Sequence, residues 1–222
     1  MTNKYREFKD NGLLVKELKN NEEKMQAYQL RHEIFHDELE WVHSMDNRQE
    51  IDSYDDHAIM IGVYDDEGNL IGTARIIYSN SPMMIEKEFS DLVPESHKLR
   101  KNSDTIEVTR FGVKKSVRKE IKGTASLALY KGLYLWSLLN NVRYMYIVVD
   151  RIMMFNLKFK GIPCRRLGRV KKNPDGCRSM GAIIDLREFE EKMKPKSETA
   201  PIRLNDSEFH SFCHNMAKAW TN

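Results

Sequence analysis

Hydrophobic residues recur along the chain at two spacings, one typical of strands and one typical of helices. Leu13–Leu18 alternates apolar and polar residues, and the segment after Asn20 repeats its apolar positions at helical spacing as far as Leu39. Ala58–Tyr64 and Leu70–Tyr78 are again strand-like, and the polar DDEGN between them contains the glycine that a hairpin turn needs. The first third of the chain therefore predicts a strand, a helix and a β-hairpin.

The rest of the chain continues this alternation. Residues 85–92 predict a short helix, 105–113 a strand, the apolar run from Gly123 to Asn141 a buried helix, and 143–149 a central strand. Within the strand at 105–113, alternation places Ile106, Val108 and Arg110 on one face and Glu107, Thr109 and Phe111 on the other. The last predicted elements are a helix at 151–160, strands at 165–170 and 180–186 around a turn at 173–176, and helices at 187–193 and 205–220.

This order predicts a mixed α/β (α+β) fold, in which helices cover both faces of a central sheet. The strands at 105–113 and 143–149, with the helix between them, fit a βαβ crossover. The order resembles that of GNAT-type acyltransferases. We therefore expect a GNAT-like three-layer sandwich that forms a single domain spanning residues 1–222, although the order of elements alone does not establish a function.

Composition narrows the class of protein further. The 222 residues are 31% charged and 41% apolar, as in a globular domain, and no apolar run reaches the roughly 18 residues of a membrane span. The N-terminus lacks the apolar core of a secretory signal. Cys164, Cys177 and Cys213 are odd in number and have no CxxC spacing, which predicts reduced thiols in a cytoplasmic protein.

Positive charge is concentrated in two runs, 114–122 and 165–172, although the net charge is only +3. Such runs commonly form a solvated face, but they also suit nucleic acid, membrane headgroups or an acidic protein. No nucleic-acid recognition motif accompanies them, so we expect no nucleic-acid partner.

The polar segment after the first predicted helix has an unusual composition. Glu50, Asp52 and Asp55 follow the spacing E-x-D-x-Y-D, with Trp41 before them. Three carboxylates can bind Ca²⁺ or Mg²⁺ through their oxygen atoms, but the segment lacks a glycine at the position where an EF-hand loop requires one, which argues against a calcium site of that type. The alternatives are pairing with arginines, a solvated loop, or a grip on a cationic substrate beside an aromatic ring such as that of Phe35.

Charged residues also interrupt the predicted strands. Glu107 and Arg110 stand among apolar and β-branched residues, and Arg75 lies within the hairpin. Burial of such groups is costly unless they are paired, so Glu107 and Arg110 form a structural ion pair or face a cleft where Glu107 accepts a proton from an amine. Glu120–Ala125 matches the phosphate-binding glycine motif of GNAT folds only in part. The seven histidines show no ligand spacing, and no metal site is predicted.

Together these residues resemble the acyl-homoserine-lactone synthase (autoinducer synthase) family, which is related to GNAT acyltransferases. The first family motif is matched by Leu30, Arg31, Phe35, Trp41, Glu50, Asp52, Tyr54 and Asp55. The later motifs are matched by Arg75 in GTARI, by Pro82, Met84 and Phe89, and by Ile106–Val113. The resemblance covers about residues 25–170.

The resemblance implies acyl transfer from acyl carrier protein to the amine of S-adenosylmethionine, then lactone closure with release of methylthioadenosine. The donor would be acyl-phosphopantetheine on the carrier protein, and no cofactor would be bound permanently. Glu107 would assist amine deprotonation, and Arg75 and Arg110 would order the pocket. The substrate-binding residues would be Arg31, Phe35, Trp41, Glu50, Asp52, Asp55, Phe89, Thr109, Phe111 and Ile147. The acidic carrier protein would dock on Lys114, Lys115, Arg118, Lys119 and Lys122.

Some positions depart from the family pattern. Glu38 stands where a basic residue or glutamine is usual, Ile106 replaces an aromatic residue and Thr109 replaces a serine. Ile147 stands where makers of 3-oxo products tend to carry threonine, which argues against a 3-oxo acyl chain. Two alternatives stay open: an N-acyl amino acid synthase, whose acceptor is a free amino acid, and a binding protein that senses an acyl ligand.

Overall fold

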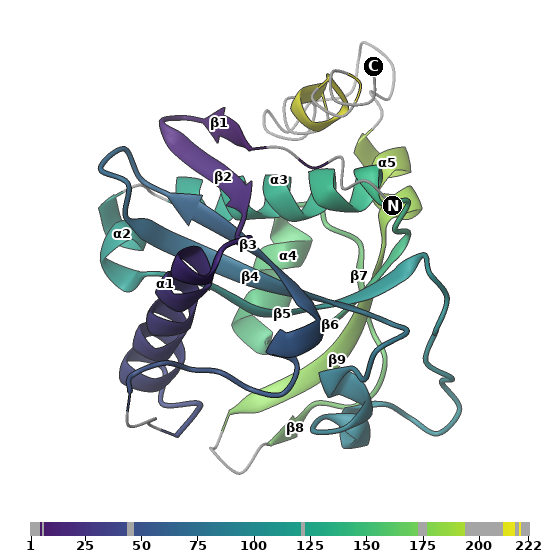
Figure 1. Cartoon of the computed structure of the whole chain (residues 1–222). Coiled ribbons are helices and arrows are strands. Elements are labelled where there is room, and N and C mark those ends of the chain that lie inside the picture. The colour runs from purple at the N-terminus through teal and green to yellow at the C-terminus, as the bar shows by residue number, and fades with distance from the viewer. Residues whose placement is uncertain are drawn as a thin grey trace. The chain divides into compact units, whose positions relative to one another are not determined.

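The computed structural model describes residues 5, 7–43, 47–120, 123–172, 177–193, 211–215 and 218. The chain divides into two compact units, each assembled from segments that are far apart in the sequence. The N-terminal unit comprises Tyr5–Ile77 and Val108–Trp136, and the C-terminal unit comprises Met1–Lys4, Tyr78–Glu107 and Ser137–Asn222. Figure 1 labels the α-helices and strands of both units.

The N-terminal unit contains most of the long strands. Its elements are β1 Phe8–Asp10, β2 Leu13–Glu17, α1 Asn21–His32, the π-helix η1 Glu33–Glu38, the 3₁₀ turn η2 Asp55–His57, β3 Ala58–Tyr64, β4 Leu70–Tyr78, β5 Thr105–Val113, α2 Lys115–Glu120 and α3 Thr124–Leu139. The last residues of β4 and α3 and the first residues of β5 belong to the C-terminal unit. The strand order is β1-β2-β3-β4-β5, and β1 to β4 pair antiparallel.

Helices cover both faces of the sheet in this unit. Ile61 of β3 points toward α3, because a Cβ atom added at Gly132 would lie 3.1 Å from its Cγ2. The preceding residue, Met60, shares a buried cluster with Ala27 of α1 and therefore points to the opposite face. The predicted arrangement of helices on both sides of a sheet is confirmed here.

The start of α1 is fixed by side-chain hydrogen bonds, and its end continues into a π-helix. Asn20 accepts a hydrogen bond from the backbone N–H of Glu23 at 2.8 Å, and the Glu23 side chain accepts one in return from Asn20 N–H, so the two form a capping box. After His32 the helix widens into the π-helix η1, which sequence periodicity does not predict.

The C-terminal unit contains the remaining strands of the sheet. Its elements are the 3₁₀ turns η3 Met84–Glu86 and η4 Ser90–Leu92, the strand β6 Tyr144–Asp150, α4 Arg151–Phe159, β7 Cys164–Arg166, β8 Lys171–Lys172, β9 Arg178–Asp185 and α5 Leu186–Met193. The strand order is β5-β6-β9-β7, with β8 also on β9, and β6 pairs antiparallel with β9 along its whole length. Asp150 caps α4 by accepting the Met153 N–H at 2.6 Å.

Most predicted elements are confirmed to within a few residues, but the helix at 85–92 is wrong. Two 3₁₀ turns occur there instead, because the backbone N–H groups of Met84 and Ile85 donate to the carboxylate of Glu107 and so fix a tighter path. The strand at 165–170 is also shorter than predicted, and β1 and α2 were not predicted.

Several predicted features lie wholly or partly outside the described residues. The turn at 173–176 is outside them, and of the last predicted helix the structure describes 211–215 and 218, which are helical. Cys164, Cys177 and Cys213 are free cysteines, and burial raises the pKa of the Cys164 thiol to about 11. Among the described helices, none is both long and apolar enough to cross a membrane.

Candidate active site

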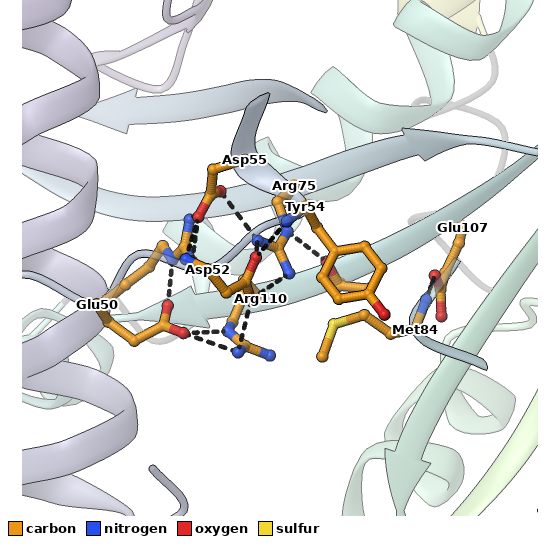
Figure 2. Close-up of polar contacts among 10 residues, drawn as sticks. Glu50, Asp52, Tyr54, Asp55, Arg75, Met84, Glu107 and Arg110 are labelled. Carbon is orange, nitrogen blue, oxygen red and sulfur yellow. Dashed lines mark hydrogen bonds and ion pairs between the residues drawn. The ribbon is translucent and has the colours of Figure 1, made fainter. Parts of the chain in front are cut away.

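Six charged residues of the N-terminal unit form one network of ion pairs (Figure 2). Arg31 comes from α1, Arg75 from β4 and Arg110 from β5, whereas the three carboxylates come from the segment 50–55. The members are Arg31, Arg75, Arg110, Glu50, Asp52 and Asp55. Three positive charges thus meet three negative charges at the place where two strands and a helix approach an irregular segment.

Arg31 is fully buried and binds two of the acids. Its Nη1 and Nη2 donate to the two oxygens of Asp55 at 2.6 and 3.0 Å, and its Nε donates to Glu50. This fork-to-fork geometry is the strongest arrangement that a guanidinium and a carboxylate can adopt. The backbone N–H of Glu50 also donates to the Tyr28 carbonyl at 3.0 Å, which fixes the start of the acidic segment against α1.

Arg75 is also fully buried and connects the other end of the segment to the sheet. Its Nη2 donates to Asp52 at 2.9 Å, its Nη1 donates to Asp52 and to Asp55, and its Nε donates to the Thr109 hydroxyl at 2.9 Å. Its place opposite Met60 in the β3–β4 register puts it on the face of the sheet that α1 covers.

Arg110 has a left-handed backbone conformation, with a φ of 51°, inside β5. Its Nη2 donates to Glu50 at 2.7 Å and to Asp52 at 3.1 Å. Such a conformation costs a non-glycine residue roughly 1–2 kcal/mol, and it breaks the alternation of side chains along the strand. The conformation is therefore stabilised by the ion pairs that it makes possible.

This break corrects the predicted faces of β5. Alternation placed Thr109 and Arg110 on opposite faces, yet Thr109 binds Arg75 and Arg110 binds the acids that Arg75 also binds. Phe111 stacks instead on Tyr130 of α3, with ring centroids 4.7 Å apart, and so lies on the other face of the sheet from the network. The extra residue at Arg110 shifts every later side chain by one position.

The acidic segment owes its form to the same carboxylates. Asp52 accepts the backbone N–H of Tyr54 at 2.9 Å, and Asp55 accepts the backbone N–H of Asp52 at 2.9 Å. The E-x-D-x-Y-D spacing therefore suits acids that both bind arginines and close the turn. This pairing was one of the alternatives open at the level of the sequence.

Ionisation of the network depends on the balance between burial and charge. Burial tends to raise the pKa of Glu50, but hydrogen bonds and the positive charges of Arg110 and Arg31 outweigh it and lower that pKa. The pKa of Asp55 is lowered in the same way, by Arg31 and Arg75 against the effect of burial. Both carboxyl groups are therefore ionised at neutral pH.

Exposure separates the network into a buried part and an accessible part. The side chains of Arg31 and Arg75 are 0% exposed, whereas those of Arg110 and Asp52 are 16% and 24% exposed. Arg110 and Asp52 are therefore the members that solvent reaches, and the buried members hold them in place.

Aromatic rings lie beside the accessible part. The guanidinium of Arg110 sits 5.7 Å from the centroid of the Phe35 ring, and Phe35 and Trp41 have centroids 6.3 Å apart. Phe35 is buried, but Trp41 is 40% exposed. Together with Asp52 they offer a carboxylate and a π face, a combination that attracts cations.

Three further predicted residues lie in the C-terminal unit. Glu107 is fully buried, and its carboxylate accepts the backbone N–H groups of Met84 at 2.7 Å and Ile85 at 2.9 Å. Ile147 is buried on β6, and Phe89 is half-buried after η3. The anchoring of η3 by Glu107 could not be predicted, because backbone donors leave no mark in a sequence.

The predicted carrier-protein docking residues begin at the end of β5. Lys114 pairs with Glu33 at 3.0 Å, and Lys115 is exposed at the start of α2. Glu38, which departs from the family pattern, accepts the backbone N–H of Lys115 at 2.9 Å and thereby supports the first turn of α2. Arg118 and Lys119 belong to α2, although their side chains, like the whole of Lys122, lie outside the described part.

The partial glycine motif can be followed only at its ends. Gly123 has a φ of 85°, and its carbonyl accepts the Leu127 N–H at 3.0 Å, so it lies directly before α3 at the N-cap position. Residues 121 and 122 lie outside the described residues.

A second cluster of potential ligands was missed at the level of the sequence. His32, His36 and Asp37 place one ligand atom each within 4.8 Å of one another. They come from the end of α1 and from η1, and the π-helix brings His36 and Asp37 together on one side. His32 and His36 are four residues apart, a spacing that brings two side chains to one face of a regular helix, so the sequence did carry a signal for this pair. Asp37 joins them from the π-helix, which periodicity does not predict.

Comparison with known proteins agrees with the fold and defines the family. Residues 15–183 match the family model described as autoinducer synthase, and the mixed α/β fold is the GNAT-like fold of the solved structures that the chain resembles. The chain belongs to the autoinducer synthase family and is an acyltransferase.

Individual relatives are distant in sequence. The acyl-homoserine-lactone synthase of Vibrio anguillarum is 28% identical over 163 residues, which cover 72% of this chain and 84% of the relative. The crystal structure of the acyl-homoserine-lactone synthase LasI is 19% identical, with a TM-score of 0.70 over 78% of this chain and 90% of LasI. The CoA-dependent acyl-homoserine-lactone synthase BjaI, solved with S-adenosylmethionine and isopentyl-CoA, is 20% identical, with a TM-score of 0.65 over 85% and 91% of the two chains.

We predict that Asp55→Asn lowers the free energy of unfolding by about 3 kcal/mol, because it leaves Arg31 and Arg75 buried with one acid too few. Urea denaturation followed by circular dichroism measures this. The neighbouring Asp56 is exposed, so Asp56→Asn should change the free energy by less than about 0.5 kcal/mol. Equal effects of the two substitutions would show that the network does not stabilise the fold.

We also predict a loss of stability in acid. The lowered pKa values of Glu50 and Asp55 contribute stability that is fully present above their ordinary values of 4.5 and 3.8 and is lost as the pH falls through the folded-state values. The urea midpoint should therefore fall steadily between about pH 5 and about pH 3. The urea midpoint of Asp55→Asn should fall less over this pH range than that of the wild type. Parallel curves of urea midpoint against pH for the two proteins would contradict this prediction.

Proposed function

We propose that this protein is an acyl-homoserine-lactone synthase that transfers an acyl chain from acyl carrier protein to S-adenosylmethionine, in the cytoplasm, with the whole chain acting as one acyltransferase domain. The observation that carries the proposal is the accessible edge of the ion-pair network, where Asp52 and Arg110 lie beside Phe35 and Trp41. S-adenosylmethionine carries a sulfonium, an ammonium and a carboxylate. An anionic group, a cationic group and π faces complement these charges.

The reaction proceeds in two displacements. The amine nitrogen of S-adenosylmethionine attacks the thioester carbonyl carbon, the carbon–sulfur bond breaks, and the pantetheine thiol leaves. A carboxylate oxygen of the acylated product then attacks the carbon next to the sulfonium, which closes the lactone and releases methylthioadenosine. The second step is favoured because a sulfonium departs as a neutral thioether.

Glu107 is the proposed acceptor of the amine proton in the first displacement. Its carboxylate is fully buried and held in place by two backbone N–H groups, so it is oriented before substrate binds. Backbone amides of the neighbouring strands would hold the carbonyl oxygen as negative charge develops. Arg75 and Arg110 would act through the acids they bind, as positioning residues.

The proposed acyl donor is acyl carrier protein rather than coenzyme A. Support comes from the exposed Lys115 and from the basic run 114–122 to which it belongs, since carrier proteins are acidic. BjaI uses coenzyme A, so the two donors are the alternatives to compare.

Trp41→Ala should weaken binding of S-adenosylmethionine about tenfold, because it removes a π face from the sulfonium. Binding of S-adenosylhomocysteine, which lacks that charge, should weaken much less. Trp41→Phe should retain most of the affinity for S-adenosylmethionine. Calorimetric titration gives these values, and equal losses for both ligands would remove Trp41 from recognition of the cation.

Glu107→Gln should lower kcat by about 10²- to 10⁴-fold with little change in the KM for S-adenosylmethionine, because a base is lost while binding is kept. Glu86→Gln is the matched control. Glu86 also accepts a backbone N–H of the same segment, from Met83 at 3.0 Å, and has no proposed chemical role. A similar fall in kcat for both variants would mean that Glu107 acts only by holding η3.

Lys115→Glu should reduce kcat/KM for acyl carrier protein thioesters about tenfold, because it reverses a charge at the proposed docking surface. It should not affect a small acyl-pantetheine thioester. Lys9→Glu, on the exposed side of β1, is the control for a general effect of charge. A better kcat/KM with acyl-CoA than with the carrier protein, and no effect of Lys115→Glu, would overturn the choice of donor.

A further inference from the structure

The end of α1 and the π-helix η1 carry a second group of ligand-type side chains. The Nδ1 atom of His32 lies 3.6 Å from Oδ1 of Asp37, and the Nε2 atom of His36 lies 3.8 Å from the same oxygen. The three ligand atoms all lie within 4.8 Å of one another. None of these residues belongs to the ion-pair network or to the proposed chemistry.

These separations are too long for hydrogen bonds but suit a shared metal ion. A nitrogen and an oxygen that are hydrogen-bonded lie about 2.7–3.2 Å apart. Two ligands of one tetrahedral zinc, each about 2.1 Å from the ion, lie about 3.4 Å apart. The two nitrogen–oxygen separations, 3.6 and 3.8 Å, are within a few tenths of an ångström of that value, whereas the ligand nitrogens of the two imidazoles lie up to 4.8 Å apart and must move closer together to share one ion.

The groups around the cluster hold two of its ligands in the orientation that a metal requires. His36 Nδ1 lies 2.8 Å from the carbonyl oxygen of Val42, so that nitrogen carries the proton and Nε2 keeps its lone pair for a metal. A metal-bound histidine commonly has a backbone carbonyl as its second partner. Asp37 uses its other oxygen, Oδ2, to bind Arg48, which leaves Oδ1 directed at the two imidazoles.

The site is also accessible. The side chains of His36 and Asp37 are 31% and 32% exposed, whereas His32 is buried beneath them. Arg48 pairs with Asp37, but its side chain is 70% exposed and so does not bury the carboxylate. A metal ion that enters from solvent can therefore bind His36 and Asp37 first and the buried His32 afterwards.

We propose that His32, His36 and Asp37 bind a divalent transition-metal ion of the zinc type, with water in the fourth position. Two imidazoles and one carboxylate favour zinc over calcium or magnesium, which prefer oxygen ligands. The bound ion joins the last turn of α1 to η1, the π-helix that carries Phe35, and so stabilises this junction. This inference does not depend on the proposed reaction.

The test uses the full-length protein without a histidine tag, dialysed against zinc chloride and then desalted. Elemental analysis should find about one zinc ion per chain in the wild type and in His57→Ala, which removes an exposed histidine elsewhere. His36→Ala should retain less than about a fifth of that amount, and Asp37→Asn should retain less than the wild type. Bound Co²⁺ should show the visible absorption of a tetrahedral site only where zinc is retained.

Two outcomes would overturn the site. The proposal is wrong if wild-type protein holds no more zinc than His36→Ala, or if His57→Ala loses as much zinc as His36→Ala does. Circular dichroism in the presence of a chelator establishes that each variant is folded, and Asp37→Asn replaces His36→Ala if the latter is not. Addition of zinc should raise the Tm of the wild type and leave that of His36→Ala unchanged.

Discussion

The buried pairing of three guanidinium groups with three carboxylates is the interaction on which the N-terminal unit depends. Each charge costs several kcal/mol to bury, and only the complete set of partners offsets that cost. Arg31, Arg75 and Asp55 each bind at least two other groups, so no pair can be removed without exposing another charge to an apolar environment. A segment with little regular structure is held in one conformation as a result.

The same pairing produces a surface suited to a charged substrate. Asp52 and Arg110 are the members that solvent reaches, and both are fixed by buried neighbours. Arg110 reaches the acids because its backbone adopts a left-handed conformation that the ion pairs stabilise. Positions fixed in this way lose little entropy when a ligand binds, which is the usual advantage of a preorganised site.

Sequence reasoning succeeded where a physical requirement fixes the residue type. Apolar alternation located β3, β4 and β5 to the residue. The pairing of the acids of 50–55 with Arg31, Arg75 and Arg110 was one of the alternatives that the sequence left open, and the structure shows it. Sequence reasoning failed where geometry deviates from a regular element. The left-handed conformation at Arg110 could not be predicted because the residue is not a glycine, so Phe111 was placed on the wrong face of the sheet. The residue types at 33–38 likewise do not distinguish a π-helix from an α-helix.

The identity of the acylated product tests the central claim most directly. Purified protein supplied with S-adenosylmethionine, a mixture of free amino acids and acyl carrier protein thioester would be analysed by mass spectrometry. We expect an acyl-homoserine lactone and methylthioadenosine in equal amounts, with no acyl amino acid. An acyl amino acid formed without methylthioadenosine would show that the site holds a different amine and would contradict the assignment.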